Sequence, residues 1–495
     1  MSTRLTQSTR LARWKTLDKD LNRISHLELA TQYVARPLIA PGLGLVFLMV
    51  VAVAAMVVSG GASDQLIIIA AAVFGAYMAL NVGANDVANN MAPAVGANVL
   101  TMGGAIAIAA VCEASGALIA GGDVVATIAG AIVSPASLAD RSSFILAMMV
   151  ALIAAALWIN LVTWLGAPVS TTHSVVGGVM GAGIAAAGFG AVNWPTMGGI
   201  AASWVVSPVM GGVVAALVLA FIKARIEDKA DKIAAARLWV PVLIGVMAGA
   251  FATYLALKGV AQVVDIAIPT ALMLGLGVGL VAAIAARPMV RRQAQGLENR
   301  KRSLKKLFNV PLIGSAALLS FAHGANDVAN AVGPLAAIVH AVRDGDFVAT
   351  VQIPFWVMIV GAAGISFGLM LFGPKLIGMV GSQITRLNPM RAYCVALSAA
   401  LTVIVASALG LPVSSTHIAV GAVFGVGFYR EWHAERRARM LGSVAAIPVA
   451  LEERKRRRLV RRSHFVTIIA AWVVTVPCTA VASGLLFLLL RKVGM

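Results

Sequence analysis

Long runs of apolar residues make up most of this chain, separated by short polar segments. Nine runs are long enough to cross about 30 Å of hydrocarbon as helices, at 42–60, 65–95, 98–120, 197–222, 239–258, 268–286, 309–341, 350–373 and 465–490. Two further runs, 143–190 and 392–428, are interrupted by Gly-Ala-Pro and Gly-Leu-Pro. Proline stops the helix that precedes it, so each predicts a hairpin of two shorter helices that meet inside the membrane. The pattern predicts an all-α polytopic membrane protein.

Two motifs occur twice. Gly-Ala-Asn-Asp-Val-Ala-Asn begins at Gly83 and again at Gly324, and Pro-Val-Ser-(Thr/Ser)-Thr-His begins at Pro168 and again at Pro412. The two motifs are similarly spaced in both halves of the chain. We therefore predict two related halves, each with one broken-helix hairpin.

A third, weaker echo pairs Trp-Val-Val-Ser-Pro from Trp204 with Trp-Val-Val-Thr-Val-Pro from Trp472. The first repeat then covers 65–222 and the second covers 309–490. The remaining parts are a leader at 1–41, an extra transmembrane helix at 42–60, basic loops with a linking helix pair at 223–308, and a basic insertion at 430–462 within the second repeat.

Positive charge predicts the orientation of these segments. Lys and Arg number 39 against 20 Asp and Glu, a net charge of +19. They crowd the leader, 223–237, 287–306 and 430–462, and basic loops remain in the cytoplasm. The amino end is then cytoplasmic, the carboxyl end lies outside, and the two repeats have inverted topology. Transporters built from inverted repeats hold their substrate near the midplane, between the repeats.

Composition supports a bilayer as the solvent. Hydrophobic residues make up 60% of the chain and charged residues only 12%, whereas soluble domains carry about 25% charged residues. A soluble chain this basic would suggest nucleic acid, but topology accounts for the charge, so no nucleic-acid partner is expected. Cys112, Cys394 and Cys478 lie in apolar runs without a paired motif and indicate buried small residues. No secretory leader is expected, and the cell inner membrane is the simplest location.

The duplicated Asn-Asp pairs are candidates for a cation site. These are Asn85-Asp86 and Asn326-Asp327. A carboxylate in an apolar span is costly and needs a partner or a function. Its oxygens and the neighbouring amide oxygens suit Na⁺, or the carboxylates take up H⁺. The alternative is an Asp held by hydrogen bonds between packed helices. Gly83 and Gly324 permit either close backbone approach or unwinding.

The two hairpin motifs are candidates for an anion site. Proline and Ser or Thr favour a helix start, and a helix start attracts oxyanions. Two facing starts would surround a small tetrahedral anion with neutral donors. The alternative is ordinary capping of a broken helix. The hydroxyls concerned belong to Ser170, Thr171, Thr172, Ser414, Ser415 and Thr416.

Other polar residues in apolar runs leave alternatives open. His173 and His417 follow the caps. They either pack with hydrogen bonds, donate to the anion, or carry a proton. His323 has Val82 at its counterpart position, which argues against an essential symmetric role. Glu113 has no carboxylate counterpart; it binds a coupling cation or proton, or accepts a hydrogen bond between helices.

No catalytic or nucleotide-binding signature is present. The sequence lacks GxxxxGK[ST], HExxH and paired-cysteine metal motifs, so ATP-driven transport by this chain and metalloenzyme chemistry are not indicated. The adjacent Ser and His residues lack a third member of a hydrolase triad. We therefore expect no enzyme activity and no cofactor other than the transported coupling ion.

The duplicated motifs resemble the PiT family of inorganic phosphate transporters, and the resemblance covers nearly all of 65–490. It implies that the Asn-Asp segments and the hairpin hydroxyls build the cation and phosphate sites. For a sodium-coupled member, Asp86 and Asp327 would ligate Na⁺. Members couple to Na⁺ or H⁺, some carry a metal–phosphate complex, and some relatives carry sulfate. The segments 42–60 and 430–462 depart from the simplest family pattern.

The expected function is cation-coupled symport of inorganic phosphate by alternating access, with the lipid bilayer as the surroundings and a homodimer as a further possibility. A sulfate permease of the same family is the alternative within transport. A channel or a membrane-embedded sensor is the alternative outside it. The short cytoplasmic loops disfavour the sensor, and the motif spacing does not distinguish Na⁺ from H⁺.

Overall fold

The computed structural model describes residues 38–60, 64–133, 138, 140–165, 169–262, 264–344, 353–383, 387–440 and 462–494. Ten helices in these ranges are long and apolar enough to cross a membrane. The only β-structure among the described residues is an isolated bridge between Val133 and Val192. The prediction of an all-α polytopic membrane protein is therefore confirmed. Pro168, most of the leader and the basic run 454–458 lie outside the described residues.

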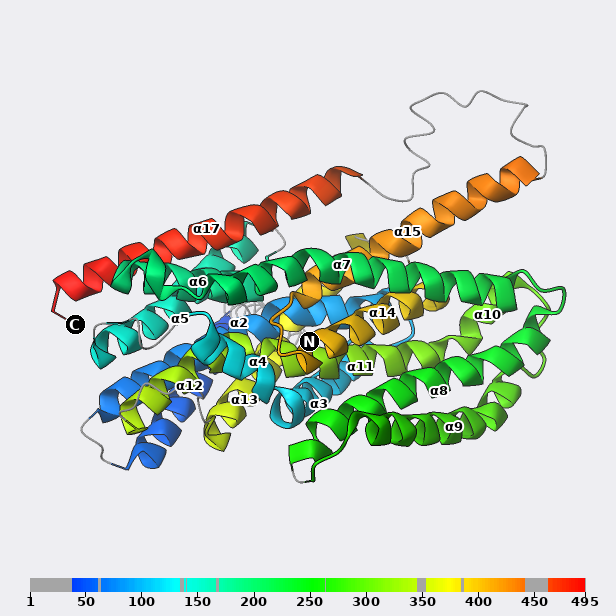
Figure 1. The fold of residues 1–495 in the computed structure, drawn as a ribbon. Helices are drawn as coiled ribbons and strands as arrows, with labels where there is room; N and C mark the ends of the chain where they lie inside the picture. The colour runs from blue at the N-terminus through cyan, green and yellow to red at the C-terminus, as the bar shows by residue number, and fades with distance from the viewer. Residues whose placement is uncertain are drawn as a thin grey trace, which may run out of the picture. The chain divides into compact units, whose positions relative to one another are not determined.

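The helices follow the predicted order (Figure 1). The helix Leu38–Ser59 comes first. The first half contains α2 (Gln65–Gly96), α3 (Met102–Ala120), α4 (Gly122–Ala126), α5 (Arg141–Trp164), α6 (Thr171–Ala187) and α7 (Trp194–Ile222). The linking segment contains α8 (Lys232–Lys258), α9 (Ile268–Gln293) and α10 (Lys301–Leu307). The second half contains α11 (Asn309–Asp327), α12 (Ala329–Asp344), α13 (Phe355–Gln383), α14 (Pro389–Ala408), α15 (Ser415–Met440) and α17 (Arg462–Lys492).

Two details bear on the predicted spans. The run 309–341 was predicted as one span, and α11 and α12 continue through Val328, whose φ of −56° and ψ of −31° are helical. The bend lies earlier, where a 49° angle separates α10 from Asn309–Arg343. The first copy of the motif lies within the continuous helix α2. The first arms of the two hairpins, α5 and α14, are also each long enough to cross a membrane alone, rather than short.

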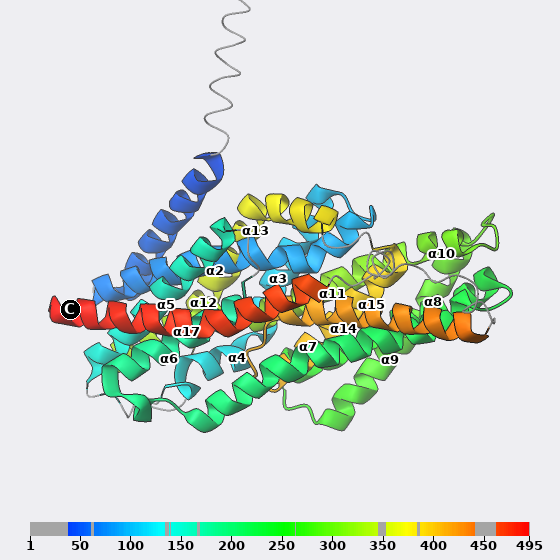
Figure 2. The ribbon, with the colours of Figure 1, turned by 90° about the horizontal axis from the view of Figure 1, so that it is seen from above.

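Helices of the two halves pack in a reciprocal pattern. Helix α2 packs along α13, and α11 packs along α3. Helix α17 packs along α6, and α7 packs along α15 (Figure 2). Each of these helices therefore packs along a helix of the other half, and α11 also packs as extensively on α14 of its own half. This exchange is what two related halves predict; their inverted orientation in the bilayer stays a prediction.

Glycines in the first motif allow the exchanged helices to touch. A Cβ at Gly83 on α2 would collide with the backbone of Ile365 on α13. A Cβ at Gly324 on α11 would collide with the backbone of Glu113 on α3. Small residues at contacts of this kind are typical of helix packing in lipid. Of the two roles open for these glycines, the structure shows close approach, which places the Asn-Asp motifs beside the opposite half.

Candidate functional site

The hairpin motifs form two capped helix starts. Ser170 precedes α6, and its Oγ accepts a hydrogen bond from the backbone N–H of His173 at 3.2 Å. Ser414 precedes α15 in the same way, and its Oγ accepts from the N–H of His417 at 3.4 Å. The predicted helix starts are present, and both capping serines bind their own helices. The remaining hydroxyls of the two tips are the groups that reach across to other elements.

The residue after each cap binds the Asp of its own half. Thr171 Oγ1 donates to Asp86 Oδ2 at 2.9 Å. Ser415 Oγ donates to Asp327 Oδ2 at 2.8 Å. These four residues occupy matching positions in the two motif copies. The structure therefore brings the two predicted sites, hydroxyl and carboxylate, into direct contact within each half.

The next residue of each tip connects the two halves. Thr416 Oγ1 donates to Asp86 Oδ1 at 2.9 Å and accepts from Asn89 Nδ2 at 2.8 Å. Its counterpart Thr172 accepts from Asn330 Nδ2 at 3.2 Å and donates to the carbonyl of Val413 at 3.0 Å. Asn89 and Asn330 are themselves matching residues, one turn after each Asp. One polar network thus joins both tips and both motif helices.

The amides of Asn85 and Asn326, predicted as cation ligands, bind the hairpins instead. Asn85 Oδ1 accepts from Thr163 Oγ1 at 2.8 Å on the first arm of hairpin one. Asn326 Oδ1 accepts from the N–H of Val413 at 3.2 Å, and its Nδ2 donates to Ser407 Oγ at 2.9 Å. In this structure both amides hold the hairpin arms against the motif helices. Their role as cation ligands stays a prediction.

His323 lies at the centre of the site and was the residue that sequence reasoning discounted. Its Nε2 is 2.9 Å from Asp327 Oδ2 and 3.8 Å from Asp86 Oδ2. Its Nδ1 is 3.3 Å from Glu113 Oε2. One imidazole therefore connects three carboxylates. The sequence does contain one indication of this role: His323 lies four residues before Asp327, which places both side chains on one helix face.

Glu113 belongs to the same cluster although it lies on α3. Besides His323, it accepts from Asn90 Nδ2 at 2.9 Å. Both Glu113 and His323 are fully buried. A buried carboxylate needs hydrogen bonds or an opposite charge, and these two partners supply them. The contact exists because Gly324 lets α11 approach α3 at Glu113.

Three side chains in this cluster could share one cation. Asp86, His323 and Asp327 each offer one ligand atom, and these atoms lie within 4.8 Å of one another. Asp327 Oδ1 has no hydrogen-bond partner among the described residues. Hard cations prefer oxygen ligands, while imidazole suits transition metals or a proton. The carboxylates fit Na⁺ by themselves, whereas His323 fits a proton better.

The aspartates and the tip hydroxyls of the site are buried, while Asn85 and Asn89 are partly exposed. The hydroxyl residues of the two tips are at most 8% exposed, and Asp86 and Asp327 are 2% and 1% exposed. His173 and His417 pack between the tips, with ring centroids 4.5 Å apart, and His173 also lies 3.9 Å from the ring of Trp204. A solute can reach these groups only after the helices around them move.

A helical membrane protein with a buried polar site where two broken-helix tips meet is, by class, a transporter. The chain belongs to the phosphate transporter family, whose model matches residues 82–483. This is a family of transporters, not of enzymes.

Individual relatives agree along most of the chain. A Helicobacter pylori (strain J99) protein named "Putative phosphate permease" is 45% identical, covering 95% of this chain and 98% of the relative. A Pyrococcus abyssi protein of the same description is 34% identical, covering 85% and 97%. A solved structure titled "The sodium-dependent phosphate transporter" is 34% identical with a TM-score of 0.78, covering 86% of this chain and all of that one.

Proposed function

We propose that this protein is a symporter that carries inorganic phosphate across the inner membrane together with a cation, by alternating access. The observation that carries this proposal is the polar network at the hairpin tips. Hydroxyls from both tips converge on Asp86 and Asp327, so an anion bound at the tips would lie next to any cation bound at the carboxylates. Family membership supports phosphate as the anion.

The phosphate would bind between the starts of α6 and α15. A helix start favours an oxyanion through its dipole and its first N–H groups, and the two caps take up only the N–H groups of His173 and His417. Thr171, Thr172, Ser415 and Thr416 add hydroxyl donors, and Ser170 and Ser414 hold the starts in place. Neutral donors of this kind leave the anion free to depart, whereas a buried arginine pair would hold it strongly.

The hydrogen-bond directions suggest how the cation and phosphate are coupled. A hydroxyl has one proton to donate, and the protons of Thr171, Thr416 and Ser415 now point to carboxylates. A cation on Asp86 and Asp327 would compensate their charge and allow these hydroxyls to turn. The hydroxyls would then donate hydrogen bonds to phosphate oxygens, so cation binding prepares the phosphate site.

The two possible coupling ions make different demands on the cluster. Na⁺ would take the carboxylate oxygens as ligands and requires a neutral His323. H⁺ would reside on His323 or a carboxylate, and the imidazolium would balance the charges of Asp327 and Glu113. The solved relative is titled sodium-dependent, and the contacts of His323 favour a proton. A divalent cation at the Asp86–His323–Asp327 cluster would correspond to transport of a metal–phosphate complex.

Phosphate fits the site better than sulfate. Near neutral pH phosphate still carries a proton and needs an acceptor, which sulfate does not. Asp86 and Asp327 lie within hydrogen-bond distance of the hydroxyls that would hold the anion, so they supply that acceptor. The comparisons give no support to a sulfate permease.

Uptake into liposomes tests the proposal. Purified protein would be reconstituted, and labelled phosphate uptake followed under an imposed Na⁺ gradient and, separately, an imposed pH gradient, each with sulfate as competitor. We expect one gradient to drive uptake and excess sulfate to leave it unchanged. Uptake that neither gradient accelerates would contradict coupling, and inhibition by sulfate would make the tips a general oxyanion site.

A further inference from the structure

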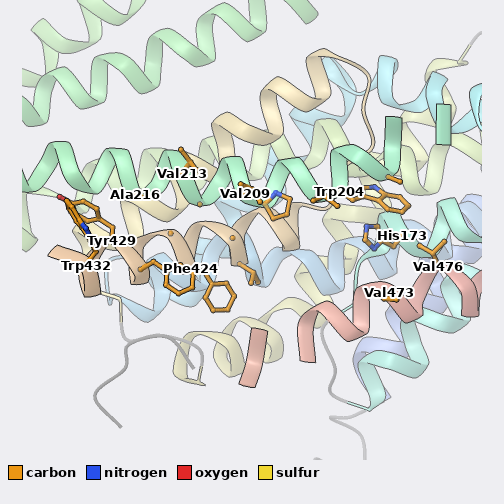
Figure 3. Close-up of a pocket in the computed structure, with 18 residues that line it drawn as sticks. His173, Trp204, Val209, Val213, Ala216, Phe424, Tyr429, Trp432, Val473 and Val476 are labelled. Carbon is orange, nitrogen blue, oxygen red and sulfur yellow. The ribbon is translucent and has the colours of Figure 1, made fainter. Parts of the chain in front are cut away.

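A long apolar groove lies outside the polar site. It is formed by α7, α15 and α17, and has a volume of about 940 Å³. Figure 3 shows His173, Trp204 and Val476 at one end and Tyr429 and Trp432 at the other. The groove therefore runs along α7 from the neighbourhood of the hairpin tip to the end that bears the basic loops.

The middle of the groove is entirely apolar. Val209 and Val213 of α7 and Phe424 of α15 line this part of the groove (Figure 3). Val209 is 59% exposed and Val213 is 47% exposed, so neither side chain is covered by the protein. The volume is at the upper end of the roughly 300–1,000 Å³ of ligand pockets. A lining without polar groups over this length fits a hydrocarbon chain.

Cations lie at the aromatic end of the groove. Lys223 Nζ is 5.9 Å from the ring centroid of Tyr429, and the Arg436 guanidinium is 5.3 Å from that of Trp432. Neither cation is paired with a carboxylate among the described residues. Aromatic side chains next to Lys and Arg are typical of the level of lipid headgroups.

Three acidic groups near this end have other partners: Glu227, Asp228 and Glu435, the last of which lies 3.5 Å from Arg439. Glu227 binds Lys301, with Oε1 and Nζ 2.7 Å apart. Asp228 lies 3.5 Å from His433 Nε2, and the other nitrogen of His433 is 3.3 Å from Lys223 Nζ. The positive charges of Lys223 and Arg436 are therefore available to an anion at the mouth of the groove.

We propose that this groove binds an anionic phospholipid, with an acyl chain between α7, α15 and α17 and its phosphate headgroup on Lys223 and Arg436. The apolar length fits the chain, and the two cations fit the headgroup. Each Lys or Arg near anionic lipid strengthens binding. The lipid would separate the packed pair α7–α15 from α17 up to the level of His173.

Lipid retention on the purified protein tests this site. The delipidated protein in nonionic detergent would receive phosphatidylglycerol or phosphatidylcholine, and bound lipid would be counted by native mass spectrometry. We expect tighter binding of phosphatidylglycerol, and no displacement of it by millimolar inorganic phosphate. The double variant Lys223→Gln/Arg436→Gln should bind phosphatidylglycerol about 30-fold more weakly, which corresponds to ~2 kcal/mol for two charges. Lys305→Gln, at an exposed position elsewhere, is the matched control.

A second variant tests the groove itself. Val213→Trp should fill the groove and weaken both lipids, whereas Leu217→Trp, on the same helix outside the groove, should behave as wild type. Equal binding of phosphatidylglycerol by wild type and the charge variant would overturn the proposal. The proposal would also be overturned if wild type self-associated and a Val213→Trp variant kept its lipid but no longer self-associated, because the groove would then hold a second copy. Arg436 is exposed, so Arg436→Gln should fold normally. If another variant does not fold, the binding of phosphatidylglycerol by this single variant decides whether the proposal holds.

Discussion

Replacing Thr416 by valine removes one hydroxyl from the site and keeps the side-chain shape. In the structure this hydroxyl donates to Asp86 Oδ1 at 2.9 Å and accepts from Asn89 Nδ2 at 2.8 Å. If this hydroxyl donates to phosphate once a cation is bound, the variant loses a hydrogen-bond donor to a charged group. Such a hydrogen bond contributes about 1.5–3 kcal/mol.

This magnitude sets the expected effect on phosphate. A loss of this size corresponds to a roughly 10- to 150-fold higher KM for phosphate. The cation should be affected differently, since the variant leaves the oxygens of Asp86 in place and removes a competitor for one of them. Half-saturation by the cation should therefore be unchanged or occur at a lower concentration.

The assay is the initial rate of labelled phosphate uptake in liposomes, titrated first with phosphate and then with the coupling cation. The matched control is Thr402→Val on α14, where the hydroxyl donates only to the carbonyl of Ser398 at 2.8 Å within its own helix. The control should keep the wild-type values. Two results for Thr416→Val would refute the proposal that this hydroxyl turns from Asp86 to phosphate. One is an unchanged KM for phosphate, and the other is an equal weakening of the cation and phosphate affinities.

Three further predictions concern the carboxylates, the imidazole and the helix contact. Asp86→Asn should abolish gradient-driven uptake while the protein remains in the membrane; normal uptake by this variant would remove Asp86 from the cation site. His323→Gln should abolish uptake driven by a pH gradient if the proton is the coupling ion, and a rate profile from pH 5 to 8 identical to wild type would exclude a titrating role for His323. Gly324→Ala should lower the melting temperature in detergent, since its Cβ would collide with the backbone of Glu113 and overpacking costs about 1–3 kcal/mol. Gly103→Ala, with no atom within 4 Å of the added Cβ, should melt as wild type does.

The elements of this fold could be predicted because each depends on local sequence. The lengths of the apolar runs predicted the helices, and the duplicated motifs indicated the two halves. The helix starts at Ser170 and Ser414 follow from capping chemistry. The two copies of the Asn-Asp motif also share a helical backbone, because Val328 in the second copy has φ −56° and ψ −31°.

The composition of the site was only partly predictable. Asp86, Asp327 and the hydroxyls are predicted from the repeat, and the structure brings them into contact. His323 has no counterpart in the first half, so an argument from symmetry discounts it. Its importance depends on its distance from Glu113, which is set by the packing of α11 on α3. The spacing of residues along the chain does not predict the distance between His323 and Glu113.

Phosphate binding to the purified protein, with and without the coupling cation, tests the central claim most directly. Calorimetry on wild type would give the phosphate affinity in saturating Na⁺, at low pH, and with neither ion in excess. We predict that one cation tightens phosphate binding, and that phosphate tightens binding of that cation by the same factor, as linkage requires. Phosphate binding of equal strength under all three conditions would contradict the proposal that the hydroxyls turn from the carboxylates to phosphate when a cation binds.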